Sequence, residues 1–321
     1  IEYASVPLSC YDSKGYCREA YDSISALLEN YYASRDTITR IRQKSSDLRR
    51  IVQTALERSC KKYDLQLKQL KDTEKREKYR IYGELLNTYG YELKGGEKSF
   101  KCINYYDNEE ITIPLDPQLT ARENAQKHFD KYNKLKRTYE ALSQLTMETK
   151  AEVDHLESVS SALDIALEEN DLVQIKEELM EFGYVKKRRA NEKRPKITSK
   201  PFHYISSDGY DIFVGKNNYQ NEELTFKVAS GNDWWFHAKG IPGSHVIVKS
   251  NGQTDLPDRV FEEAGALAAY YSKGRENDKV EIDYIQKKNI KKVAGAAPGF
   301  VIYHTNYSLV ASPRCDLKEV K

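Results

Sequence analysis

The chain has 321 residues, of which 31% are charged and 39% are hydrophobic, and its formal net charge is +2. This length predicts about two domains, and the hydrophobic fraction excludes a wholly disordered chain. No apolar run approaches the roughly 20 residues of a membrane-spanning helix, so we expect no membrane insertion. The five cysteines are scattered and contain no C-x-x-C pair, which favours reduced thiols in a cytoplasmic protein and argues against a zinc site or another cofactor.

The first residues, 1–20, do not begin with Met and contain no signal peptide. A signal peptide would need a basic start followed by an apolar run. The start therefore looks like a cut through a longer protein.

Residues 21–183 have the pattern of a helical hairpin. Apolar and small side chains follow alternating steps of three and four from Ile38 to Leu70 and again from Tyr132 to Leu167. Each stripe is too narrow to make a globular core, so we expect the two to pack on each other as a long antiparallel coiled coil. The alternative is a spacer or a rod through which two copies dimerise.

A different structure is predicted at about residues 75–120, between the two stripes. Ser99–Ile103 and Glu110–Leu115 alternate in strand fashion around the dipeptide Asp107-Asn108. This arrangement predicts a small β-hairpin at the tip of the coiled coil. The residues that we expect to form a contact surface at this tip are Tyr105, Tyr106 and Asp107.

Local signals also mark helix ends. Thr120, shortly after Asp116-Pro117, predicts the start of the descending helix. A short helix is predicted over Asp171–Phe182, with Asp171 as its N-cap and Gly183 as its stop.

Residues 184–200 form a basic segment with eight basic side chains and one acidic side chain. Such a run is typical of a solvated linker, and it also fits an electrostatic arm for RNA. The two interpretations are compatible. The basic residues singled out here are Lys186, Lys187, Arg188 and Arg189.

Residues 201–321 predict a compact domain. One helix is indicated from Asp258 to Lys273. Strand patterns occur at His203–Ser206, Tyr210–Val214, Leu224–Ala229, Trp234–His237, His245–Lys249, Val280–Ile285, Phe300–His304 and Ser308–Ala311. The fold class of the chain is therefore α+β, with a bent, mostly antiparallel sheet and a helix on one face of this domain.

The segment Asp233–His245 holds both tryptophans and two of the six histidines. Side chains alternate faces along a strand, so at most one of the two tryptophans can face a given core layer. Aromatic, imidazole and ammonium groups beside the turn Pro242-Gly243 suit base stacking and phosphate contact. The residues predicted to form this platform are Trp235, His237 and Lys239. His245 is as readily a buried polar residue.

Two further groups are candidates for RNA contact. Lys216, Asn217 and Asn218 follow a strand on a loop that Gly215 begins, where amide and ammonium donors can meet phosphate. The same residues fit an ordinary turn. The second group is a cluster of four lysines, Lys287, Lys288, Lys291 and Lys292. The sequence contains no G-x-S-x-G motif, P-loop or G-x-G-x-x-G motif, so we expect a binding protein and not an enzyme.

Three segments resemble the C-terminal NFACT-R domain, and they are Tyr210–Asn218, Asp233–His245 and Lys291–Val301. Two more, Arg80–Leu86 and Tyr106–Glu109, resemble the coiled-coil and middle region of the same NFACT family. This family includes bacterial RqcH and eukaryotic NEMF, together with Gram-positive proteins named as fibronectin-binding proteins.

The resemblance covers nearly all of the chain from about Tyr21 onward. It implies that residues 1–20 are a remnant of a preceding N-terminal domain and that residues 201–321 are an NFACT-R-like domain. It further implies ribosome-associated quality control: binding of the large ribosomal subunit, its rRNA and tRNA, in support of alanine tailing of stalled nascent chains.

The competing interpretation of the resemblance is a surface adhesin that binds host fibronectin or fibrinogen after non-classical export. No residue pattern in the chain encodes that function, and the last residues contain no sorting signal. RNA binding should weaken steeply with salt, whereas adhesion through shape should weaken less.

Overall fold

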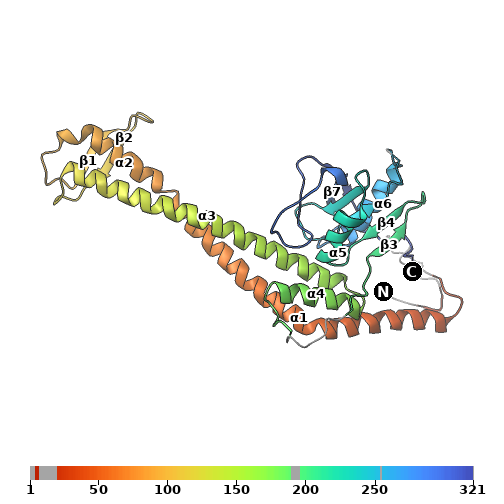
Figure 1. Cartoon of the computed structure of the whole chain (residues 1–321). Coiled ribbons are helices and arrows are strands. Elements are labelled where there is room, and N and C mark those ends of the chain that lie inside the picture. Colours follow the sequence, from red (N-terminus) through yellow and green to blue (C-terminus); the bar gives the residue numbers. More distant parts are fainter. Residues whose placement is uncertain (1–3, 7–19, 189–195, 254, 321) are drawn as a thin grey trace. The chain divides into compact units, whose positions relative to one another are not determined.

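The computed structural model describes residues 4–6, 20–188, 196–253 and 255–320 (Figure 1). Most of the predicted N-terminal remnant and Arg189 of the basic segment lie outside this range. The chain divides into two compact units, the first formed by residues 1–55 with 155–321 and the second by residues 56–154. The α+β class is confirmed, because a long bent helical hairpin precedes an antiparallel sheet domain. The domain boundaries drawn from the sequence stay a prediction.

The two limbs of the hairpin are α1 (Ile24–Thr73) and α3 (Ala121–Ile165). The predicted stripes supply many of their buried positions, which are Ile41, Ser45, Leu48, Val52, Thr146, Thr149, Val153 and Leu156. Within the first unit, the Arg49 guanidinium binds the Asp164 carboxylate and the carbonyl oxygen of Leu163. The apolar stripe therefore marks the covered side of each helix.

The stripe fails at two places. Gln66 is buried while Leu67 is exposed, because an ideal helix drifts by about 20° per heptad and moves the covered side by one residue after several heptads. Leu167 is also exposed, since α3 ends at Ile165 and the position is no longer helical.

The predicted hairpin at the tip is confirmed within the second unit. Strands β1 (Ser99–Ile103) and β2 (Glu110–Pro114) pair antiparallel. They pack with α2 (Arg76–Tyr89) and the short η2 (Gly90–Glu92) around a core of Tyr82, Leu85, Leu86, Phe100, Ile113 and Ala125. A Cβ on Gly83 would lie 2.8 Å from the Phe129 ring, so this glycine allows α2 to approach α3 closely.

The predicted start of α3 is confirmed, and that of α4 is corrected. The backbone N–H of Glu123 donates to Thr120 Oγ1 at 3.3 Å and the Glu123 carboxylate accepts from Thr120 N–H at 2.8 Å, as predicted for the start of α3. Helix α4 spans Glu169–Glu181, so Asp171 is not its N-cap. Glu168 is the N-cap, and Asp171 occupies the third helical position, where its carboxylate accepts the N–H of Glu168.

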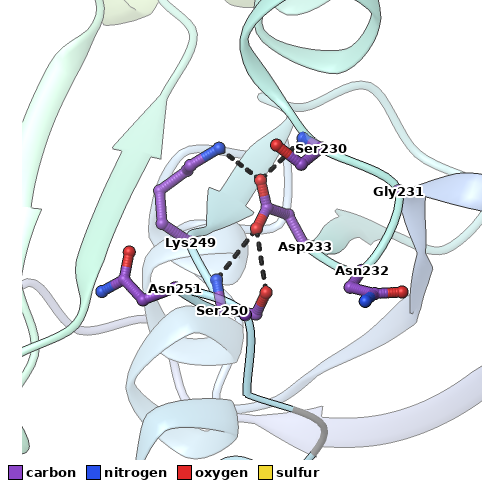
Figure 2. A pocket seen from close by; sticks show the side chains of 8 residues that line it. Ser230, Gly231, Asn232, Asp233, Lys249, Ser250 and Asn251 are labelled. Atoms are coloured by element: carbon purple, nitrogen blue, oxygen red, sulfur yellow. Dashed lines mark hydrogen bonds and ion pairs between the residues drawn. The ribbon is translucent and has the colours of Figure 1, made fainter.

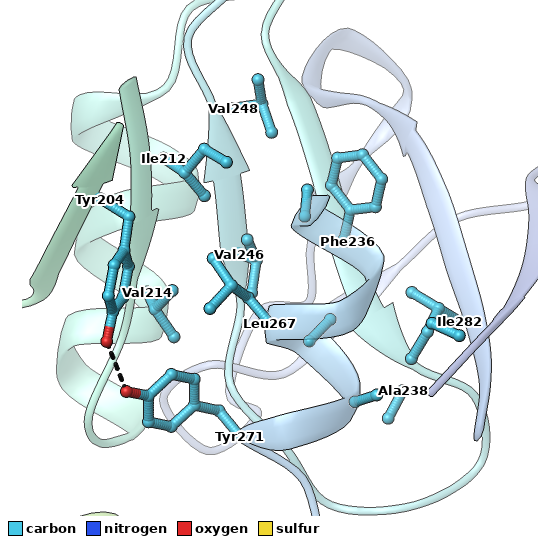
Figure 3. Packing of buried hydrophobic residues seen from close by; sticks show 14 of the residues in the cluster. Tyr204, Ile212, Val214, Phe236, Ala238, Val246, Val248, Leu267, Tyr271 and Ile282 are labelled. Carbon is cyan, nitrogen blue, oxygen red and sulfur yellow. Dashed lines mark hydrogen bonds between the residues drawn. The ribbon is translucent and has the colours of Figure 1, made fainter. Parts of the chain in front are cut away.

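The C-terminal sheet has six strands in the order β10-β7-β5-β6-β4-β3, all paired antiparallel. Their bounds are β3 Phe202–Ile205, β4 Asp211–Val214, β5 Trp234–Ala238, β6 Val246–Val248, β7 Val280–Gln286 and β10 Tyr307–Ala311. Helix α6 (Asp258–Tyr270) covers one face. Figure 3 shows the core there, in which Leu267 of α6 meets Val246 and Phe236 of the sheet.

The opposite face has a cover that the sequence did not predict. Leu224–Ala229 was expected to be a strand, and this was wrong. Asn217 caps α5 (Asn218–Glu223), and the chain continues as a π-helical turn, η3, over Leu224–Val228. The neighbours Leu224 and Thr225 are both buried in this helical cover.

The strand predicted over Phe300–His304 is shorter than expected. It is observed as β9 (Val301–Ile302), which pairs with β8 (Lys291–Lys292) as a two-stranded ribbon after η4 (Lys287–Asn289). The C-terminal tail lies along the edge strand β3, where Val320 N–H donates to the His203 carbonyl at 2.8 Å. Among the described residues, no helix combines the length and apolarity needed to cross a membrane.

Candidate nucleic-acid interface

The predicted lysine cluster lies at the surface of the sheet domain. Lys288, Lys291 and Lys292 are exposed and Lys287 is half-buried. Lys292 Nζ lies 2.7 Å from Glu222 Oε1, so one of these ammonium groups already has a carboxylate partner. The other three are available to an anionic ligand such as the phosphate backbone.

Two loops beside this cluster are tied together by Asp233 (Figure 2). Its carboxylate accepts hydrogen bonds from Ser230 N–H at 2.7 Å and from Ser250 N–H at 2.9 Å, and it pairs with the Lys249 ammonium. Burial opposes ionisation here, but these hydrogen bonds and the Lys249 charge outweigh it and keep the pKa of Asp233 below its usual value. Asp233 is therefore a fixed anion that organises both loops.

The loops border an open hollow of about 440 Å³. Its lining residues are Ser230, Gly231, Asn232, Asp233, Lys249, Ser250, Asn251 and Gly252. In Figure 2 the amides of Asn232 and Asn251 lie on opposite sides of Asp233. Asparagine amides can pair with base edges, so the hollow offers groups for base contact next to the lysine cluster.

Backbone contacts fix the lysine cluster to this hollow. Lys287 N–H donates to the Asp233 carbonyl at 2.9 Å, and Lys288 N–H donates to the Gly231 carbonyl at 3.0 Å. The hollow and the start of the lysine cluster thus form one continuous surface, which we call the basic rim. It comprises the eight lining residues with Lys287 and Lys288.

Trp235 is not part of an exposed stacking platform, so that prediction was wrong. Only 1% of its surface is exposed, and it packs in a cluster with Leu224, Ile247, Ile285 and Ile290 under η3. Its strand register pairs it with Ile247 and Ile285, whose side chains point to the same face. Trp234 is the less buried of the two indoles and packs against the α6 side of the sheet.

His237 lies in the same aromatic layer and is only partly exposed. Its ring stacks on Trp235, with centroids 5.6 Å apart and planes inclined by 17°. Burial lowers the pKa of His237 to about 4, against a smaller opposing effect of the Gly243 backbone. The ring is therefore a neutral support of the Pro242-Gly243 turn, and it carries no charge for phosphate at neutral pH.

His245 is buried. This confirms its interpretation from the sequence as a buried polar residue. Its Nδ1 lies 2.8 Å from Thr225 Oγ1 and 3.2 Å from the Asn221 carbonyl. Burial and the neighbouring His237 lower its pKa well below the usual value. His245 thus links β6 to the helical cover of the sheet.

Lys239 is exposed, as predicted. Its ammonium lies 2.5 Å from Glu281 Oε1 across the β5–β7 pair. Both side chains are about half exposed, so the pair is open to exchange with a phosphate partner.

Lys216, Asn217 and Asn218 are buried, so the prediction that their donors meet phosphate was wrong. Lys216 Nζ lies 3.5 Å from Asp171 Oδ1 and 4.4 Å from the centre of the Phe202 ring. Asn217 Nδ2 donates to Gln174 Oε1 at 2.8 Å.

The network extends into α3 through Asn218. Its Nδ2 donates to Glu178 Oε1 at 2.7 Å and to Ser158 Oγ at 2.8 Å, and His155 Nε2 lies 2.8 Å from the same Glu178 oxygen. We call this set the docking network. Its members are His155, Ser158, Asp171, Gln174, Glu178, Ser199, Lys216, Asn217, Asn218 and Gln220.

The described part of the basic linker is mixed. Lys186 and Lys187 are exposed, as a solvated linker or an RNA arm requires. Arg188 is half-buried and pairs with Glu177 of α4. The two interpretations of the linker stay open.

The predicted contact residues of the tip belong to the second unit. Tyr105 and Tyr106 are exposed. Tyr106 Oη donates to Glu84 Oε2 at 2.6 Å, which fixes the ring. The Asp107 carboxylate accepts from Asn104 Nδ2 at 2.8 Å and Glu109 N–H at 3.0 Å, so it also shapes the turn.

Two protein-family models cover the chain. A model described as NFACT N-terminal and middle domains matches residues 1–198, and one described as the NFACT protein RNA binding domain matches residues 200–304. The chain belongs to the NFACT family. We refer to residues 200–304 as the NFACT RNA-binding domain.

Relatives extend this NFACT assignment. The chain is 43% identical over 304 residues to the Rqc2 homolog RqcH of Streptococcus suis, covering 94% of this chain and 54% of that protein. It is 36% identical over 307 residues to the Rqc2 homolog RqcH of Bacillus subtilis, covering 94% and 53%. The chain therefore spans about half the length of the curated relatives it matches.

A solved structure is also similar. The C-terminal part of the fibronectin/fibrinogen-binding protein from Streptococcus suis matches with a TM-score of 0.66 at 38% identity, covering 86% of this chain and 97% of that one.

Sequence reasoning missed the polar residues of the hollow in the NFACT RNA-binding domain, notably Asn232, Lys249 and Asn251. One available signal was the dipeptide Asn251-Gly252 directly after a strand, since both residues have positive φ (51° and 83°) and mark a turn. Asp233 joins this turn to the loop at Ser230 because β5 and β6 pair. This pairing cannot be predicted from the local sequence.

We expect the NFACT RNA-binding domain to lose stability as the pH falls from about 6.5 to about 4. The pKa of His237 is about 4 in the folded protein against the usual 6.5, so the unfolded chain binds the proton more tightly in this window. The contribution of the neutral His237 ring to stability is fully present above about pH 6.5. Midpoints of thermal unfolding at pH 7, 6 and 5 measure it.

The variant His237→Gln should flatten this pH dependence, whereas the variant His304→Gln, at an exposed position, should leave it unchanged. Equal slopes for wild type and His237→Gln would contradict the assignment.

Proposed function

We propose that this chain is the helical and RNA-binding portion of a cytoplasmic ribosome-associated quality-control factor. It binds the large ribosomal subunit and tRNA, with contacts to rRNA, and supports alanine tailing of stalled nascent chains. The peptide-bond chemistry belongs to the ribosome, so this chain acts by binding and not as an enzyme.

The observation that carries the proposal is the basic rim within the NFACT RNA-binding domain. The exposed Lys288 and the half-buried Lys287 border a hollow whose asparagine amides can meet base edges. The names of the relatives, Rqc2 homolog RqcH, point to the same pathway.

The name of the similar solved structure suggests the other candidate, binding of fibronectin or fibrinogen at the cell surface. One experiment distinguishes the two candidate functions. Purified large ribosomal subunits and immobilised fibronectin are offered to the protein side by side over a salt titration.

Selective ribosome binding that weakens steeply with salt supports the quality-control function. The proposed function is overturned if the chain binds fibronectin at high salt and does not bind ribosomes, and if the full-length protein behaves in the same way.

The triple variant Lys287→Glu, Lys288→Glu, Lys291→Glu is expected to bind tRNA about tenfold to a thousandfold more weakly. Each lost phosphate contact should also lower the slope of log K against log salt by about 1. Filter binding or fluorescence anisotropy at several salt concentrations measures both quantities. Lys292 stays unchanged because it pairs with Glu222.

The matched control reverses three exposed lysines of α1, Lys61, Lys62 and Lys68, and thus changes the net charge equally. An equal loss in both triple variants would mean that net charge alone decides the affinity, and would contradict a specific RNA contact through Lys287, Lys288 and Lys291.

A further inference from the structure

An exposed aromatic side chain, Phe300, lies directly before strand β9 of the β8–β9 ribbon. Lys291 pairs with Ile302 and Lys292 with Val301. Val301 packs against the core cluster around Trp235. Side chains alternate along a strand, so Ile302 points away from the core.

Exposure agrees with this alternation. Phe300 is 49% exposed and Ile302 is 39% exposed. Lys291, the cross-strand partner of Ile302, is exposed as well. The ribbon and the residue directly before β9 therefore expose an aromatic ring, an aliphatic side chain and an ammonium group. We call Lys291, Phe300 and Ile302 the ribbon platform.

The support beneath the platform is well anchored. Ile290, directly before β8, is buried in the same cluster as Trp235. Gly299, directly before Phe300, has φ of 77°, and its N–H lies 3.4 Å from Glu222 Oε2. A Cβ at Gly299 would lie 3.1 Å from the Asn218 carbonyl, so the chain here is held against α5.

The loop that joins β8 to β9 ends in small residues directly before Phe300. Its residues after Val293 are Ala294, Gly295, Ala296, Ala297, Pro298 and Gly299. Small residues allow close approach of another backbone.

Charge decides the kind of partner. An exposed aromatic ring alone would suit any apolar surface. Here Lys291 belongs to the platform, and Lys287 and Lys288 precede it by a few residues. An aromatic ring beside cations is the arrangement that binds single strands, because bases stack on the ring while phosphates meet the lysines.

We propose that the ribbon platform stacks an unpaired nucleotide, so that the NFACT RNA-binding domain prefers single-stranded RNA segments to duplexes. This inference rests on the proposed RNA-binding function and goes further, because it names the form of the RNA and the stacking residue. Duplex bases are stacked on each other and cannot occupy the ring of Phe300.

The test compares a single-stranded RNA octamer with a blunt RNA duplex of the same length, using fluorescence anisotropy at fixed salt. Phe300→Ala should weaken binding of the octamer about 5- to 150-fold and leave duplex binding unchanged. Phe300→Trp should preserve octamer binding, and its added indole fluorescence should be quenched by the octamer. Thermal unfolding of each variant verifies the fold.

The matched control is Tyr307→Ala, which removes a ring of β10 that is more exposed (62%) than Phe300 (49%). It should leave octamer binding unchanged. Octamer binding that survives Phe300→Ala, or an equal loss for octamer and duplex, overturns the platform while the proposed RNA-binding function stands. Wild-type protein that binds neither RNA overturns both.

Discussion

Replacing Lys216 with glutamate is expected to destabilise the first unit by about 3–5 kcal/mol, because it leaves a buried charge without its partner and adds a like charge. Lys216 is 8% exposed and its ammonium lies 3.5 Å from the Asp171 carboxylate, which is itself buried. For a unit of this size the midpoint of thermal unfolding should fall by about 6–20 °C. Calorimetry or circular dichroism measures it.

The companion variant Lys216→Met separates charge from packing. It keeps the length of the side chain over the Phe202 ring and introduces no second carboxylate. Asp171 retains its hydrogen bonds from Ser199 Oγ at 2.6 Å and Leu167 N–H at 3.0 Å. The loss should therefore be smaller than for glutamate. If Lys216→Glu kept the wild-type midpoint and only weakened RNA binding, the buried docking network would be wrong.

Replacing Trp235 with alanine is expected to lower the free energy of unfolding by about 3–5 kcal/mol. The indole is 1% exposed and fills the centre of the cluster between the sheet and η3. Its removal leaves a cavity next to His237 and Tyr303, whose ring centres lie 5.6 Å and 5.3 Å from that of Trp235. Urea unfolding monitored by circular dichroism gives the value.

Phenylalanine at the same position is the control. The Trp235 Nε1 is buried without an acceptor among the described residues, so Trp235→Phe removes no hydrogen bond and should cost less than alanine. Equal losses for the two variants, or none for alanine, would contradict the buried placement of Trp235.

The docking network also gives the Lys216-Asn217-Asn218 motif a role other than RNA contact. These residues belong to the loop that leads into α5, and their partners belong to α3 and α4. Because the bonds are buried and include a charged pair, they fasten the NFACT RNA-binding domain to α4 within the first unit. The basic rim and the ribbon platform remain free for a ligand.

Local periodicity was sufficient for much of the fold. The steps of three and four along α1 and α3, the alternation in β1 and β2, and the helix at Asp258 are all readable without tertiary contacts, since side-chain direction repeats with the backbone geometry. The lysines at 287–292 were also found, because a run of charges near turn residues seldom becomes buried.

Tertiary structure decided which of the polar and aromatic candidate residues are buried and which are exposed. A lysine in a sequence does not reveal whether its partner is a phosphate or a carboxylate, and the partner of Lys216 is Asp171, 45 residues away. Alternation limits each face to one tryptophan, but only the register of β5 against β6 and β7 put Trp235 on the face that η3 covers. The sequence by itself determined the helical hairpin, most of the strands and the lysine cluster, since these follow from neighbouring residues. Burial of a given side chain depends on which distant element packs over it, and that only the tertiary structure decided.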